Sequence, residues 1–182
     1  MIAAFALQPH PAFPAPPGVQ LGVQVARRSP QQVALEYRAE GNIEDVVIPP
    51  PAAMPTRADG LWQATCFELF LQPEGDEAYV ECNFAPSEDW AVYGFDGYRA
   101  GMRPLDVPAA PDVRVERREH ALVVKVELAL PLTSGVWRIA PAAILADRDG
   151  ARSFWAVKHG AGEPDFHRAD CFVGRLPPPP AP

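Results

Sequence analysis

The chain has 182 residues, of which 48% are hydrophobic and 21% charged, as is usual for a globular protein. Its net charge of −7 and pI of about 5.1 argue against nucleic acid or an anionic membrane as a partner. No apolar run is long enough to cross a bilayer, and the amino-terminal segment lacks the basic residues of a secretion signal. We therefore expect a cytoplasmic protein with neither a nucleic-acid nor a membrane partner.

Proline is unusually frequent, with 23 residues against the usual share of about 5%. Prolines at this density interrupt helices, and no segment carries an apolar stripe at helical spacing over three turns. The last six residues, Pro177–Pro182, predict an extended, disordered proline-rich tail. We therefore expect one domain over residues 1–176, with few or no helices.

Alternating apolar and polar residues predict a series of short strands separated by turn sequences such as Asp96-Gly97 and Asp149-Gly150. Many short strands with regular turns are typical of an all-β antiparallel sandwich of immunoglobulin-like or jelly-roll type. In chain order the predicted strands are Ile2–Leu7, Val19–Arg27, Gln32–Ala39, Val46–Ile48, Thr65–Leu71, Ala78–Phe84, Trp90–Phe95, Val113–Arg118, Leu122–Leu130, Ile139–Asp147, Ser153–Val157 and Cys171–Leu176.

The stretch GLWQATCFELFL, residues 60–71, places a carboxylate among apolar neighbours. Glu68 shares the second face of its strand with a cysteine and a phenylalanine, and a buried carboxylate is costly unless it is paired. A hairpin turn centred on Glu74 and Gly75 sets Glu68 opposite Glu81, with Asn83 on the same face. Like charges in opposition are destabilising, so we expect a cation, a metal ion, a shared proton or a polar ligand to offset them.

The loop HGAGEPDFHRADCF, residues 159–172, is the second candidate site. Long loops with polar and aromatic residues often carry binding function in β-sandwiches. His159 and His167, with Asp165 or Asp170, are residue types that suit zinc, although loop histidines and aspartates more often complete turns and caps. The three cysteines form no paired motif, which predicts buried, reduced thiols at Cys66, Cys82 and Cys171.

The segments LWQATCFELFL, YVECNFAPSEDWAVYGFDGYRAGM and SFWAVKHGAGEPDFHRADCF resemble the bacterial DOMON-like proteins. Their superfamily also contains the family 9 carbohydrate-binding modules and the haem-binding DOMON cytochromes. The resemblance runs from about Leu61 to Leu176. It implies an immunoglobulin-like or jelly-roll β-sandwich and a small-molecule ligand.

The resemblance also implies a sugar site. The sugar-binding modules clamp a saccharide between two aromatic rings, and a strand glutamate contacts its hydroxyls. By spacing, Trp62 and Phe166 match the two rings, with phenylalanine in place of tryptophan, and Glu68 matches the glutamate. Glu81 replaces an arginine that the modules carry two residues before Asn83. The expected ligand-binding residues are Trp62, Glu68, Glu81, Asn83, Phe166 and His167.

We therefore predict a non-catalytic module that binds a small carbohydrate, without a metal or a cofactor. Two alternatives remain open. Met102, Lys158 and His159 are residue types that ligate haem in the DOMON cytochromes. Glu68 and Glu81 could instead be the carboxylate pair of an enzyme that acts on glycosides. The sequence does not predict an oligomeric state.

Overall fold

The computed structural model describes residues 2–131 and 135–178, and its fold is all-β. Every pairing between its named strands is antiparallel. Two three-residue 3-10 turns, η1 (Leu61–Gln63) and η2 (Ala169–Cys171), are the only helical elements in the described part. This confirms the prediction of an antiparallel β protein with few helices. Most of the predicted tail, residues 179–182, lies outside the described residues.

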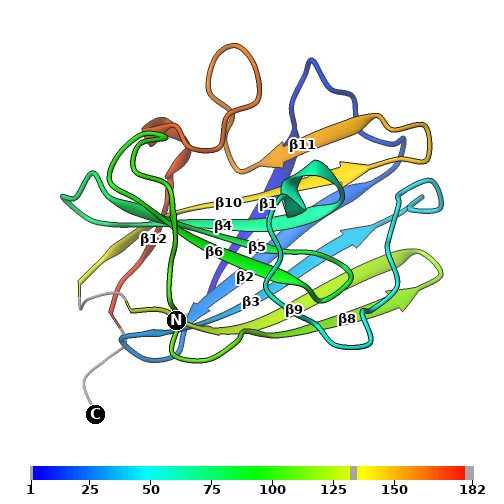
Figure 1. The fold of residues 1–182 in the computed structure, drawn as a ribbon. Helices are drawn as coiled ribbons and strands as arrows, with labels where there is room; N and C mark the ends of the chain where they lie inside the picture. Colours follow the sequence, from blue (N-terminus) through cyan, green and yellow to red (C-terminus); the bar gives the residue numbers. More distant parts are fainter. Residues whose placement is uncertain (1, 132–134, 179–182) are drawn as a thin grey trace.

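The strands form one curled sheet with two halves (Figure 1). The first half has the order β1-β2-β3-β9-β8, and the second has the order β7-β6-β5-β4-β10-β11, with β12 also paired to β10. The end of β1 joins the halves by pairing with β11. The strands are β1 (Ile2–Pro9), β2 (Gln20–Arg27), β3 (Gln32–Glu40), β4 (Cys66–Pro73), β5 (Tyr79–Phe84), β6 (Trp90–Phe95), β7 (Arg103–Pro104), β8 (Asp112–Arg118), β9 (Ala121–Ala129), β10 (Trp137–Ala146), β11 (Arg152–Ala156) and β12 (Gly174–Leu176).

The main core lies between the two halves. It combines alternate residues of the first half, such as Leu35 and Val124, with alternate residues of the second half, such as Leu69 and Ile139. The Tyr37 hydroxyl on β3 donates a hydrogen bond across this core to the backbone carbonyl of Glu68 on β4. The halves are thereby held face to face, which leaves the opposite face of the second half available for a separate cluster.

Two predicted strands differ from the structure. Val46–Ile48 forms no strand, and only the isolated bridge from Val46 to Asp147 remains. The prolines that follow at 49–51 have no N–H groups with which to extend a ladder. The last strand is limited to β12 because the residues before it turn into η2. No described helix is long and apolar enough to span a membrane.

The register predicted for the β4–β5 hairpin is wrong by two residues. Glu68 pairs with Asn83, and Glu81 pairs with Phe70. The turn is centred later than expected because the amide of Asp76 bonds to the carbonyl of Pro73, and the Asp76 carboxylate accepts from the amide of Ala78. A shift of two residues keeps each side chain on its predicted face. The two glutamates therefore share a face as diagonal neighbours and are not directly opposed.

Candidate functional site

The outer face of the second half carries a row of small residues interrupted by one carboxylate. The strand registers place Ala91, Asn83, Glu68, Ala142 and Ala156 side by side across β6, β5, β4, β10 and β11. None of the five is more than 3% exposed. Because all five side chains are almost fully covered, residues of other elements must pack over this row, and we refer to the covered row as the trough.

The covering residues include both predicted aromatic rings. Trp62 is half-buried in η1, and its ring meets the edge of Tyr93 at a centroid distance of 6.0 Å. Phe166, in the loop after β11, is 8% exposed and lies 6.3 Å from the rings of Phe70 and Phe154. Trp62 and Phe166 pack against the same outer cluster, but no ring contact joins them among the described residues.

Trp62 lies in η1, before the strand that carries Glu68. Gly60 adopts a left-handed conformation (φ 75°) that begins the 3-10 turn, so the chain reverses before β4 starts at Cys66. Glycine tolerates positive φ without a steric penalty, which permits this turn immediately before the tryptophan. The ring consequently packs against the outer cluster from a turn and not from a strand.

The two carboxylates and Asn83 form a buried polar group within an aromatic cluster. Glu68 is 2% exposed and Glu81 is 4% exposed. The Asn83 Nδ2 donates to Glu81 Oε1 at 2.8 Å. Glu68 Oε1 and Asn83 Oδ1 are buried and have no hydrogen-bond partner among the described residues. Buried polar atoms are nearly always paired, so each of these two acceptors calls for a donor.

Burial is the main reason that the pKa of Glu68 lies well above its usual range, and the charge of Glu81 raises it further. A contact with the Cys66 thiol acts in the opposite direction on this pKa. The pKa of Glu81 is also raised by burial, although its hydrogen bond from Asn83 and the charge of Arg99 lower it in part. The two carboxyls therefore retain a proton at higher pH than isolated glutamates do.

Within the described ranges, no arginine forms an ion pair with Glu68. Arg99 Nη2 pairs with Asp165 Oδ1 at 2.8 Å, and Arg103 Nη1 pairs with Asp96 Oδ1 at 2.6 Å. Each of these two arginines therefore has another carboxylate as its partner. Arg99 influences Glu81 only by its charge.

His167 lies at the Glu81 side of the site. Its Nδ1 is 2.8 Å from the Tyr79 hydroxyl, and its Nε2 is 3.7 Å from Glu81 Oε2. Burial lowers the pKa of His167 to about 4, with a further contribution from the charge of Arg99. The imidazole is therefore neutral at physiological pH and adds no positive charge to the site.

Sequence reasoning missed two residues beside this group. Tyr93, on β6, stands next to Glu81 across the ladder and donates its hydroxyl to Asp59 Oδ1 at 2.6 Å. Burial and the nearby carboxylate of Asp59 raise the pKa of Tyr93. The alternation of Ala91, Tyr93 and Phe95 could have placed this tyrosine on the outer face, but Asp59 lies in a segment without periodicity.

The residues considered for metal or haem do not form a cluster in the described ranges. No group of three or more histidine, cysteine, aspartate or glutamate side chains there is arranged to hold a metal. His159 Nε2 lies 2.8 Å from the carbonyl of Gln8, and Asp170 pairs with Arg168. Met102 is exposed. The three cysteines are buried and free, as predicted.

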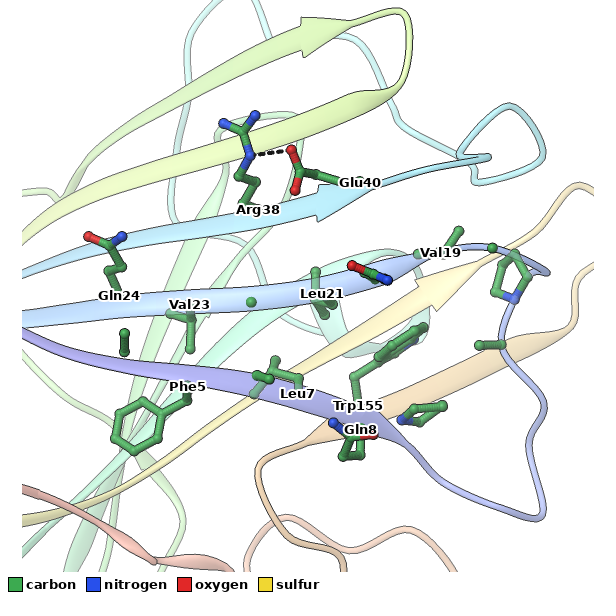
Figure 2. Close-up of a pocket in the computed structure, with 18 of the residues that line it drawn as sticks. Phe5, Leu7, Gln8, Val19, Leu21, Val23, Gln24, Arg38, Glu40 and Trp155 are labelled. Atoms are coloured by element: carbon green, nitrogen blue, oxygen red, sulfur yellow. Dashed lines mark hydrogen bonds and ion pairs between the residues drawn. The ribbon is translucent and has the colours of Figure 1, made fainter.

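Two of the surface hollows bear on the site, and neither is lined by Glu68, Glu81 or Asn83. One of about 830 Å³ runs along β1, β2 and β3, and Figure 2 shows Gln24, Arg38 and Glu40 beside it. It contains none of the predicted site residues. A second, of about 380 Å³, reaches the site from its edge and is lined by His167, Tyr79 and Arg138 among others. Of the predicted site residues, only His167 contributes to that hollow.

No protein-family model and no curated protein matches this chain. Solved structures do match it. A candidate carbohydrate-binding protein from Bacteroides uniformis superposes with a TM-score of 0.67 at 14% identity, covering 94% of this chain and 85% of that one. A family 9 carbohydrate-binding module from Caldicellulosiruptor kristjanssonii in complex with cellotriose has a TM-score of 0.57 at 11% identity, covering 87% and 75%.

A module of the same family and organism in complex with glucose has a TM-score of 0.52 at 12% identity, and the coverage is 90% of this chain and 78% of that one. At identities of 11–14%, these comparisons establish a shared fold. They agree with the part of the predicted resemblance that points to family 9 modules. Membership of the DOMON-like branch remains a prediction.

Proposed function

We propose that this chain is a non-catalytic carbohydrate-binding module built on a β-sandwich, and that its site is the trough around Glu68. One observation carries the proposal. A floor of small residues with buried, unpartnered acceptors lies beneath a cluster to which Trp62 and Phe166 both belong. The fold shared with family 9 modules supports the same interpretation.

The chemistry of the trough suits a sugar. Sugar rings present apolar C–H faces, which pack on aromatic side chains, and hydroxyl edges, which donate and accept hydrogen bonds. Trp62 and Phe166 supply the aromatic surface, while Glu68 Oε1 and Asn83 Oδ1 accept hydroxyl donors. Ligand pockets combine apolar walls with a few convergent polar groups in this way.

Access to the floor requires a movement. Glu68, Glu81 and Asn83 are almost fully covered, so a ligand reaches them only if a covering residue is displaced. Trp62 is the more exposed of the two rings and belongs to a short 3-10 turn that carries no buried residue. We propose that this turn shifts when a sugar enters, and that Phe166 remains packed.

Isothermal titration calorimetry with mono- and disaccharides, including glucose, tests the proposal. This method needs no tryptophan signal, so it serves equally for variants in which Trp62 is replaced. Trp62→Ala removes a covering ring and should weaken binding by about 1.5–3 kcal/mol, the value of one large apolar side chain. Trp62→Phe is the matched control, because it keeps an aromatic ring at the same position.

The proposal is wrong if the wild-type protein binds no saccharide, or if Trp62→Ala binds as tightly as the wild type. Trp62 is then a packing residue of the outer cluster. Release of product from a chromogenic glycoside would contradict the non-catalytic part of the proposal and would favour the carboxylate-pair enzyme. The purified protein should also lack a Soret band, whose presence would favour the haem alternative.

A further inference from the structure

The trough has more unpartnered hydrogen-bond acceptors than unpartnered donors. The donors already have partners: Asn83 Nδ2 bonds to Glu81, the Tyr93 hydroxyl bonds to Asp59, and the Tyr79 hydroxyl contacts His167. Apart from the weak thiol donor of Cys66 and the proton that a buried carboxyl retains, what remains near the floor is acceptors, since Glu68 Oε1 and Asn83 Oδ1 are both unpartnered. A ligand that fits this site must bring donors.

The trough also contains two acidic side chains and no cationic side chain that pairs with them among the described residues. Glu68 and Glu81 occupy diagonal positions on one face of the β4–β5 pair, and both are almost fully buried. The nearest cationic side chain that acts on Glu81, Arg99, is held by Asp165, and His167 is neutral. A positive charge close to two buried carboxyls would therefore favour their ionised form.

Aromatic side chains beside the two glutamates also favour a cation. Phe70 lies two residues after Glu68 on β4 and pairs with Glu81 on β5. Tyr93, on β6, pairs with Glu81 from the other side. The faces of aromatic rings attract organic cations, and the attraction is larger where water is excluded. A positively charged group between the glutamates would meet acceptors below and aromatic rings beside it.

We propose, building on the carbohydrate function above, that the ligand of this trough is an amino sugar whose protonated amine binds between Glu68, Glu81 and Asn83. An ammonium group has three N–H donors and no acceptor, which complements the spare acceptors of the site, and its charge favours the ionised form of the two buried carboxyls. The hydroxyl groups of a neutral sugar also donate, but they leave both carboxylates without a compensating charge.

The test compares three ligands on the wild-type protein by isothermal titration calorimetry at about pH 7. Glucosamine carries a largely protonated amine at that pH, since amines of this kind titrate near 7.7–8.0. Glucose has a hydroxyl at the same position, and N-acetylglucosamine has a neutral amide. Glucosamine should bind at least about tenfold more tightly than either neutral sugar, as expected for hydrogen bonds to a charged group.

The outcomes separate this inference from the proposed function. If glucose binds as tightly as glucosamine, the amino-sugar inference is wrong while the carbohydrate function stands. If none of the three binds but another mono- or disaccharide does, the amino-sugar inference is again wrong and the carbohydrate function stands; if no saccharide binds, both are wrong. These comparisons use the wild-type chain alone and do not depend on how any variant folds.

Two variants then locate the charge. Glu68→Gln and Glu81→Gln each remove one negative charge with little change in shape, and each should reduce the preference for glucosamine over glucose. Glu127→Gln, at an exposed position of β9 in the other half of the sheet, is the matched control and should leave the preference unchanged. An undiminished preference in both site variants, confirmed as folded by circular dichroism, would refute the assignment of the amine to this group.

Discussion

Replacement of Glu68 by glutamine should stabilise the protein, and the gain should grow with pH. Burial and Glu81 raise the pKa of Glu68 well above its ordinary value of 4.5, so the folded state binds this proton more tightly than the unfolded state does. The stability that the bound proton provides is fully present below pH 4.5 and is lost as the pH rises through the folded-state pKa. The slope is at most about 1.4 kcal/mol per pH unit for one proton.

His167 has the opposite effect over part of the same range. Its pKa is lowered from 6.5 to about 4, so the unfolded state binds more protons between these values and stability from this group rises with pH. In the wild-type protein, the effects of Glu68 and His167 on the pH dependence of the unfolding free energy partly cancel. The informative quantity is therefore the difference in unfolding free energy between Glu68→Gln and the wild type at each pH, because the His167 contribution is common to both.

Near pH 4 this difference should be small, and above pH 4.5 it should increase by up to about 1.4 kcal/mol per unit. The amide in the variant keeps a donor beside Asn83 Oδ1 at every pH, whereas the wild-type carboxyl has one only while it is protonated, so a hydrogen bond there would add about 1 kcal/mol once Glu68 ionises. Urea unfolding followed by circular dichroism measures both effects. Glu127→Gln, which is exposed, should stay within about 0.5 kcal/mol of the wild type.

A variant that is less stable than the wild type near neutral pH would refute this reasoning. Such a loss would mean that Glu68 is ionised and paired with a cation in the folded protein. The buried carboxylate would then be a structural salt-bridge partner and not a spare acceptor. The amino-sugar inference would lose its main support at the same time.

Two other predictions concern residues around the site and in the core. In an NMR titration, His167 should remain neutral down to about pH 4, and a midpoint near 6.5 would show that the imidazole is solvated in solution. Gly174→Ala should cost about 1–3 kcal/mol, because a Cβ there would lie 2.6 Å from Ile139 Cγ1 and 2.8 Å from Phe5 Cζ. Gly22→Ala is its control: an added Cβ meets only the carbonyl of Phe5 at 3.5 Å, so no comparable loss is expected, and equal losses in the two variants would contradict the packing argument.

The sequence by itself determined the fold class. Alternation along segments such as Leu122–Leu130 and Trp90–Phe95 encodes which residues face the core, since a strand exposes its two faces with a period of two. Proline density excluded long helices for an equally local reason, the missing N–H group. The outer-face positions of Glu68, Glu81 and Asn83 were also predictable, because a face depends only on the parity of a residue along its strand.

Register and coverage were decided only by the tertiary structure. The Asp76 side chain moved the centre of the β4–β5 turn, so Glu68 gained Asn83 as its neighbour and Glu81 gained Phe70. The row that unites Ala91 with Ala156 spans five strands that are not all adjacent in sequence, and no local pattern encodes it. Burial of Phe166 likewise depends on a loop folding over distant strands. The sequence predicted two directly opposed glutamates, whereas the structure has two diagonal glutamates in a buried row with unpartnered acceptors. This difference arises because strand pairing and coverage depend on contacts between residues far apart in the chain.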